Sequence, residues 1–261
     1  MLQMASMRRE GDAPGALDRR PTVVFVHGLG QDERSNARLR RAVADAGYPV
    51  WATTYRPARR GIRALADELG ERIEADLGPQ RPLAAVAHSL GAILIRHLAQ
   101  RFDWQRVLML APPNQGSRVA AKLRDQALYR WAYGAVGREL ADGDAWPEPP
   151  KPFAVITGNR PLTLGNPTSW LSSAIGIFDR YVEHDGTIAV EETLLPGMRD
   201  FALVDASHTG ILDHPFTAEL ALEFLEHGRF ISRLPIDVPG VEECLERARE
   251  PVSKARDRRA A

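Results

Sequence analysis

Short apolar runs recur along the middle of the chain, and each is separated from the next by a stretch with helical or turn-forming character. The runs are rich in β-branched and aliphatic residues, which is typical of strands buried on both faces of a sheet. The predicted strands cover residues 22–27, 48–55, 83–87, 107–111, 153–157 and 201–204.

Helical periodicity occupies several of the segments between these runs. Within residues 62–77, four apolar side chains follow one another at intervals of three, four and four, with charges on the other face: Ile62, Leu65, Leu69 and Ile73. Residues 36–47 and 92–100 are also predicted helices, and residues 216–227 form an amphipathic helix with Gly228 as its expected C-cap. This alternation predicts an α/β fold, in which a mostly parallel, six-stranded sheet is wrapped by helices on both faces.

The pattern also suggests how the chain is organised. Residues 1–20 are predicted to be a disordered N-terminal arm, residues 21–230 the folded domain, and residues 231–261 a C-terminal tail with room for one short helix. Residues 117–148 look helical and residues 161–181 loop-like, and both follow strand ends, where an open α/β sheet places its ligand site. We expect both segments to cap that site; ordinary packing against the sheet edge is the alternative.

Composition narrows the classes of function. Lys plus Arg and Asp plus Glu each number 34, so no net field favours nucleic acid as a partner. The single cysteine, Cys244, cannot form an intrachain disulfide, which fits a reducing compartment. Residues 1–20 lack the apolar region of a signal peptide, and no apolar run is long enough for a transmembrane segment. We therefore expect a cytoplasmic protein, of an oligomeric state that the sequence leaves open.

The sharpest chemical signal is Ala87-His88-Ser89-Leu90-Gly91, which lies between a predicted strand and a predicted helix. It resembles the nucleophile elbow G-x-S-x-G of the α/β-hydrolases, with alanine in place of the first glycine. The nucleophile of that motif sits in a strained strand-to-helix turn, so the residues two before it and two after it must be small. The resemblance makes Ser89 the predicted nucleophile.

A serine hydroxyl is a poor nucleophile near neutral pH and needs a general base. His208 is the predicted base, because it follows the last predicted strand, where α/β-hydrolases carry their catalytic histidine. His184 and His214 are loop residues and stay open as alternatives. His27 is expected to fix its loop, and the side chain of His88 to point away from the nucleophile.

A carboxylate must orient the histidine and stabilise its charged form. Asp185 lies in the segment HDGTI, which resembles the D-G-x-V acid motif of bacterial lipases and related hydrolases. It precedes His208 by 23 positions (208 − 185), which suits an acid loop followed by a short helix and one strand. The chain order of serine, aspartate and histidine is also that of the fold. The alternatives for the acid are Glu183, Glu191 and Asp205.

The resemblance also implies an oxyanion hole and substrate-binding residues. The N–H of Leu90, at the start of a helix, is one predicted donor, and the N–H of Leu29 in the segment HGLG is the other. Gly28 is predicted to let the backbone approach the substrate. Asn114 and Gln115 are predicted to line the pocket, with a turn-forming role as the alternative.

The segment PPNQGS at residues 112–117 resembles the stretch after the strand that follows the nucleophile in lipases and GPI inositol-deacylase-like hydrolases. The resemblance covers about residues 21–228 and is to small bacterial lipases and esterases and to GPI inositol-deacylase-like serine hydrolases. It implies a compact six-stranded α/β-hydrolase that cleaves small-molecule or lipid esters with an apolar acyl group through an acyl-enzyme. A thioesterase or acyltransferase with the same triad, or a non-catalytic binding scaffold, are the alternatives. No zinc motif, phosphate loop or dinucleotide fingerprint occurs in the sequence, so we expect no metal and no cofactor.

Overall fold

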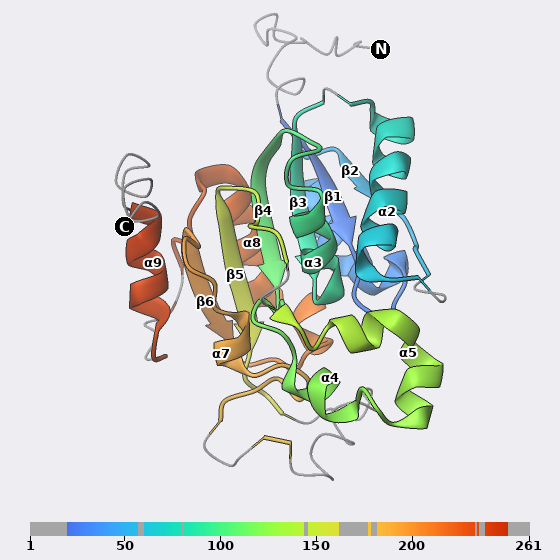
Figure 1. The fold of residues 1–261 in the computed structure, drawn as a ribbon. Helices are drawn as coiled ribbons and strands as arrows, with labels where there is room; N and C mark the ends of the chain where they lie inside the picture. The colour runs from blue at the N-terminus through green and yellow to red at the C-terminus, as the bar shows by residue number, and fades with distance from the viewer. Residues whose placement is uncertain are drawn as a thin grey trace, which may run out of the picture.

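The computed structural model describes residues 20–56, 60–79, 81–143, 146–161, 177–178, 182–232, 234 and 238–249. Six strands form one sheet in the order β2-β1-β3-β4-β5-β6, and every neighbouring pair is parallel (Figure 1). The strands are β1 (Thr22–Val26), β2 (Val50–Ala52), β3 (Leu83–His88), β4 (Trp104–Leu110), β5 (Phe153–Gly158) and β6 (Asp200–Val204). All six predicted strands are confirmed, and β2 is the one that is clearly shorter than predicted.

The strand order fixes where a ligand site can form. The chain runs from β1 outward to the edge strand β2, then returns to the other side of β1 and continues through β3, β4, β5 and β6. The direction of winding therefore reverses between β1 and β3. In an open parallel sheet, ligands bind at such a switch point, beyond the carboxyl ends of the strands. The predicted elbow after β3 and the predicted oxyanion loop after β1 meet there.

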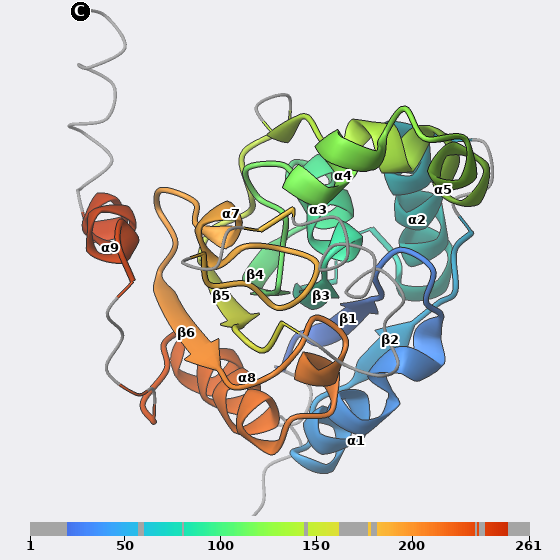
Figure 2. The ribbon, with the colours of Figure 1, turned by 90° about the horizontal axis from the view of Figure 1, so that it is seen from below.

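Alternate side chains of each strand pack on opposite faces of the sheet, as the period of two requires. Val24 and Val26 face the layer that contains α2 (Ile62–Leu77) and α3 (Leu90–His97). Val23 and Phe25 face the layer that contains α1 (Ala37–Asp45) and α8 (Pro215–His227). Figure 2 shows these two helix layers on either side of the strands. The predicted helices on both faces are thus confirmed.

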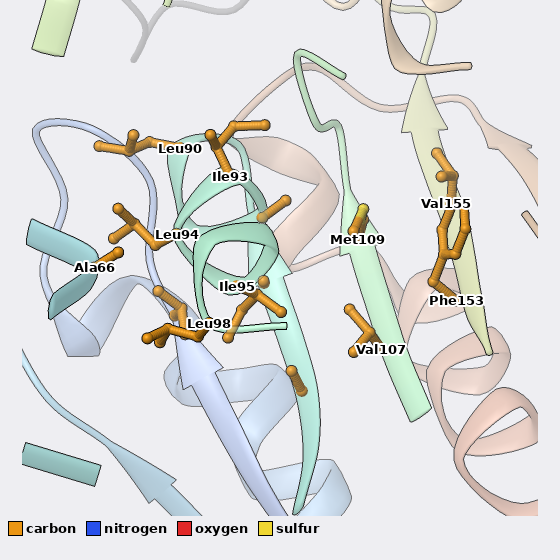
Figure 3. Packing of buried hydrophobic residues seen from close by; sticks show 14 of the residues in the cluster. Ala66, Leu90, Ile93, Leu94, Ile95, Leu98, Val107, Met109, Phe153 and Val155 are labelled. Atoms are coloured by element: carbon orange, nitrogen blue, oxygen red, sulfur yellow. The ribbon is translucent and has the colours of Figure 1, made fainter. Parts of the chain in front are cut away.

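Helix α3 is buried nearly all round, because it packs against both the sheet and α2. Its apolar side chains meet residues of α2, β4 and β5 in one cluster (Figure 3). The labelled members from α3 and the turn that follows it are Leu90, Ile93, Leu94, Ile95 and Leu98. Each fully buried aliphatic side chain contributes about 1.5–3 kcal/mol to folding. This packing fixes α3, and with it the turn that precedes it, relative to the sheet.

The predicted helical stretch after β4 contains α4 (Arg118–Leu123) and α5 (Ala127–Glu139), which lie beyond the carboxyl ends of the strands (Figure 1). Ser117 caps α4 by accepting a hydrogen bond from the N–H of Ala120 at 3.2 Å. Gly134 interrupts α5 with a φ of 58° and a ψ of −138°. The second predicted cap segment, 161–181, lies almost wholly outside the described residues.

The remaining elements are short or peripheral. They are the 3-10 helices η2 (Glu33–Asn36) and η4 (Gly210–Leu212), the short helix α7 (Val190–Thr193) and the C-terminal helix α9 (Val241–Arg249). Helix α8 ends at Gly228, the predicted C-cap, which has a φ of 69° and donates its N–H to the carbonyl of Phe224. Helix α9 packs along β6 and buries Cys244 against the core. None of the helices in the described ranges has the length and apolar character of a membrane span.

Candidate active site

Ser89 is the single residue between β3 and α3, and its backbone has a conformation that residues other than glycine rarely adopt. Its φ is 51° and its ψ is −119°. A non-glycine residue in such a region stores about 1–3 kcal/mol of strain. The N–H of Ser89 donates to the carbonyl of Leu110 at 2.9 Å, and its own carbonyl accepts from Ala92 at 3.0 Å. These bonds to β4 and α3 hold the turn against its strain.

The small residues of the elbow are explained by a close approach of β1. A Cβ atom on Gly91 would lie 2.5 Å from the carbonyl oxygen of Val26 and 2.8 Å from that of His27. Glycine is therefore required at the position two after Ser89. Ala87, which replaces the first glycine of the motif, is fully buried in β3 and packs in the α2–α3 layer. A methyl group is accommodated there.

Three side chains from distant parts of the sequence form one hydrogen-bonded chain. The Nε2 atom of His208 lies 3.0 Å from Oγ of Ser89, and its Nδ1 atom lies 2.7 Å from Oδ2 of Asp185. Because the carboxylate accepts, Nδ1 carries the proton and the lone pair of Nε2 accepts the hydroxyl proton of Ser89. All three side chains are buried, with exposures of 7%, 7% and 0% for Ser89, His208 and Asp185.

The acid is fixed by the loop that carries it. Oδ1 of Asp185 accepts the N–H groups of Thr187 at 2.9 Å and of Ile188 at 2.7 Å, while Oδ2 is left for His208. The backbone carbonyl of Asp185 also accepts the N–H of His208 at 2.9 Å. Asp185 and His208 thus share two hydrogen bonds, one between their side chains and one between their backbones. Together these bonds join the loop before α7 to the loop after β6.

Two of the alternative acids, Asp205 and Glu191, lie in ion pairs away from His208. Asp205 pairs with Arg160, and Glu191 pairs with Arg118, in ion pairs that are about half exposed. Among the alternative bases, His184 stacks on Phe178 with ring centroids 4.1 Å apart. Within the described residues, no group of three or more His, Cys, Asp or Glu side chains is placed to hold a metal ion.

A cavity of about 420 Å³ opens beside Ser89 and His208. Its polar side is formed by the loop after β1 and by Ser89 and His208, and Leu29 is part of this lining. Its apolar side comes largely from the stretch that contains α4 and α5: Val119, Ala120, Tyr129, Tyr133 and Leu140. Leu90 begins α3 directly after the serine, and its side chain points into the core cluster (Figure 3). The roles of the Leu29 and Leu90 amides as oxyanion donors stay predictions.

Three residues predicted to bind substrate do not line this cavity. The N–H of Gly28 donates to Oε1 of Gln31 at 2.8 Å. Asn114 is buried and donates to the carbonyl of Thr193 at 2.8 Å. The Gln115 amide donates to the carbonyl of Leu194 at 3.0 Å. The side chains of Asn114 and Gln115 thus join the turn after β4 to the segment of α7. This arrangement fits the turn-forming role that was the alternative for both residues.

His27 has the supporting position expected of it. Its Nε2 accepts the N–H of Tyr55 at 3.2 Å, so Nδ1 donates to the carbonyl of Gly28 at 2.8 Å. The ring also stacks on that of Tyr55, with centroids 4.1 Å apart. Burial lowers the pKa of His27 and keeps the ring neutral. These contacts of Tyr55 with the β1 loop explain why β2 ends before the predicted residue 55.

Gln31 is a residue of the site that the sequence interpretation missed. It holds the N–H of Gly28 and contacts His88, and it lines the cavity. A glutamine in a loop carries no signal in a single sequence, because its role depends on a histidine 57 positions away.

Comparisons with known proteins place the fold. No protein-family model and no curated protein matches the sequence. The mature form of a Bacillus licheniformis lipase superposes with a TM-score of 0.62 at 18% identity, over 83% of this chain and 94% of the lipase. A Legionella pneumophila phospholipase gives 0.61 at 16% identity, over 90% of this chain and 62% of the phospholipase. A metagenomic carboxyl esterase gives 0.61 at 16%, over 80% and 76%.

The described chain therefore has the α/β-hydrolase fold, as the sequence predicts. The six-stranded parallel sheet, the helices on its two faces and the structural neighbours agree on this point. At these identities the likeness is one of fold, so the chemistry must be argued from the site itself. The narrower resemblance to GPI inositol-deacylase-like hydrolases stays a prediction.

Proposed function

We propose that this protein hydrolyses carboxylic esters, with Ser89 as nucleophile, His208 as general base and general acid, and Asp185 as the carboxylate that orients the histidine. The observation that carries the proposal is the hydrogen-bonded chain of these three side chains on a strained turn beside a cavity. Hydrogen bonds of 2.7–3.0 Å join base to acid and nucleophile to base, as this chemistry requires.

In the first half of the reaction, Oγ of Ser89 attacks the ester carbonyl carbon while its proton passes to Nε2 of His208. The charge that develops on the carbonyl oxygen is met by the amides of Leu29 and Leu90, and each such donor is worth about 3–4 kcal/mol. The tetrahedral intermediate then collapses. The bond to the alcohol oxygen breaks, and that oxygen leaves with the proton from His208, which yields an acyl-enzyme.

In the second half, a water molecule attacks the acyl carbonyl and gives one proton to Nε2 of His208. The bond between Oγ and the acyl carbon breaks, and His208 returns the proton to Ser89. Asp185 stays ionised throughout and stabilises the imidazolium that forms twice in each cycle.

The shape of the cavity supports an ester with an apolar acyl group. Its lining includes Val119, Ala120 and Leu140, together with the aromatic side chains of Tyr129 and Tyr133. A volume of about 420 Å³ lies in the range of ordinary small-molecule sites of about 300–1,000 Å³. The structural neighbours described as a lipase, a phospholipase and a carboxyl esterase are consistent with such a substrate.

The proposal is tested with a chain-length series of p-nitrophenyl esters and matched thioesters, together with labelling by a fluorophosphonate. We expect ester hydrolysis, one covalent label per chain, and loss of both in Ser89→Ala, whose thermal unfolding should match that of the parent. Faster turnover of the thioesters would favour the thioesterase alternative. A folded protein that neither cleaves esters nor takes the label would favour the scaffold alternative and overturn the proposal.

A further inference from the structure

His88, the last residue of β3, contacts both the loop after β1 and the backbone of His208. The proposed mechanism requires these two parts of the site to keep a fixed relative position. Its side chain is almost fully buried, with an exposure of 1%. Nδ1 lies 2.9 Å from Oε1 of Gln31, and Nε2 lies 2.8 Å from the backbone carbonyl oxygen of His208. The rings of His88 and His208 are 4.8 Å apart between centroids. The side chain thus points away from the nucleophile, toward the backbone of the general base.

The other end of this connection is the oxyanion loop. The N–H of Gly28 donates to Oε1 of Gln31 at 2.8 Å, and this donor identifies the atom as the amide oxygen. The N–H of Gln31 returns to the carbonyl of Gly28 at 3.3 Å, which closes the turn that holds Leu29. A continuous path therefore runs from Gly28 through Gln31 and His88 to the backbone of His208.

The loop packs directly on this path. A Cβ atom added to Gly28 would lie 2.8 Å from Nδ1 of His88 and 2.9 Å from Oε1 of Gln31. Glycine at position 28 therefore permits the approach of the loop to His88, and its role in the approach of substrate stays a prediction.

We propose that His88 is a positioning residue, which with Gln31 holds the loop of Leu29 and the backbone of His208 at a fixed separation across Ser89. The proposal rests on the proposed function, because it assigns a purpose to that separation. The oxyanion donor and the base act on the same substrate carbonyl, and an error of about 1 Å between such groups costs on the order of 100-fold in rate.

The chemistry of the two contacts makes the proposal specific. Both ring nitrogens of His88 face acceptor oxygens, and a neutral imidazole has one N–H to donate. Burial and the adjacent His208 ring lower the pKa of His88 well below its usual value. A second positive charge 4.8 Å from His208 would oppose the imidazolium that forms during acylation. A side chain that fills the space without donating cannot replace this connection.

The test compares His88→Leu with two amides. Asparagine can place a donor near the Nδ1 position, toward Gln31, and glutamine can place one near the Nε2 position, toward the carbonyl of His208. We expect His88→Leu to lower kcat by about 10- to 100-fold with KM changed less than about twofold. The amide whose donor stands where the single N–H of His88 lies should recover part of the lost kcat, and both amides serve as the folded variants if leucine is not tolerated.

A second comparison asks whether the two residues act as one unit. If they do, Gln31→Leu combined with His88→Leu should cost little more in kcat than His88→Leu alone. His97→Leu is the matched control, because His97 lies on α3 and its buried Nδ1 has no hydrogen-bond partner among the described residues. Independent, multiplicative losses, or amide variants no better than leucine, would overturn the proposal.

A readout without turnover separates this proposal from the proposed function. The Nδ1–H proton of His208, which is bonded to Asp185, gives a side-chain NMR signal. We expect that signal to move in His88→Leu and to stay in place in His97→Leu, even if no ester is cleaved. An unmoved signal with a native-like thermal unfolding curve would show that His88 does not position His208.

Discussion

The cavity beside Ser89 has a floor of loops from the sheet and an apolar roof formed by α4, α5 and the turn after α5, and the two are held in different ways. On the floor, polar atoms are fixed by short hydrogen bonds, such as the two N–H groups that Oδ1 of Asp185 accepts. The roof faces the cavity with apolar and aromatic side chains. Its helix α5 is interrupted at Gly134 and carries Trp131, which is 85% exposed.

This difference indicates a division of labour between chemistry and substrate choice. Hydrogen bonds are directional and hold donor and acceptor in the geometry that the proposed proton transfer between Ser89 and His208 demands. Apolar contacts limit the size of the acyl group that fits but do not fix its orientation. They are therefore suited to selection among acyl groups. Changes in the floor should therefore alter rate for every substrate, whereas changes in the roof should alter the ranking of substrates.

After the loss of the nucleophile itself, the largest effect is expected from Asp185→Asn. Oδ1 is anchored by the N–H groups of Thr187 and Ile188, so the amide nitrogen of the new side chain must face Nδ1 of His208. The imidazole then carries its proton on Nε2 and can no longer accept one from Ser89. We expect kcat to fall by about 10⁴-fold for all esters, with unchanged circular dichroism. A loss of less than about tenfold would move the acid role to another carboxylate.

Gly91→Ala tests the packing under the floor. The new Cβ would lie 2.5 Å from the carbonyl oxygen of Val26, and neither backbone can retreat without moving α3 or β1. We expect the free energy of unfolding, measured in urea, to fall by about 2–3 kcal/mol. Ala87→Gly is the matched control on the other side of Ser89, where about 1 kcal/mol or less should be lost. Equal losses in both variants would contradict the close-approach argument.

Gly91 belongs to the part of the molecule that the sequence alone can predict. The elbow, the six strands and the helix periodicity depend on neighbours within a few positions, so the pattern along the chain identifies them. The partners of Gln31 and Asn114 lie 57 and 79 positions away, and no local pattern carries that information. Ser89 and His208 could be predicted although they are distant, because each follows a strand and parallel strands end at one edge of the sheet. Asp185 follows no strand directly, and its prediction depends on the resemblance of the segment HDGTI to a lipase acid motif.

Glu192 links the floor to the roof and makes that junction sensitive to pH. Its two carboxylate oxygens accept the N–H groups of Arg118, at the start of α4, and of Ala189, both at 2.7 Å. Burial outweighs these bonds and raises the pKa of Glu192 to about 7. A raised folded-state pKa means that the folded chain holds this proton more tightly, so its stabilising effect is full below the unfolded value of 4.5 and is lost as pH rises through 7.

We expect Glu192 to contribute a decline in the free energy of unfolding of at most about 1.4 kcal/mol per pH unit over this window, while buried histidines with a lowered pKa, such as His27 and His88, contribute in the opposite direction. Glu192→Gln should lack this contribution, so its stability relative to the parent should rise as pH rises through 7. Glu191→Gln, on the exposed side of the same helix, should keep the slope of the parent. Urea unfolding at pH 5, 6, 7 and 8 measures all three, and parallel curves would contradict the link.

The smallest effect on overall activity, and the most selective one, is expected from a change in the roof. Val119 in α4 is buried and lines the cavity, so Val119→Phe fills part of the volume of about 420 Å³ without touching Ser89, His208 or Asp185. We expect kcat/KM for a p-nitrophenyl acetate to stay within about threefold, while that for long-chain esters falls by about tenfold. Lys122→Ala, at an exposed position of the same helix, should change neither value. If Val119→Phe slowed short and long esters by the same factor, the roof would share in the chemistry of the floor, and the division between them would not hold.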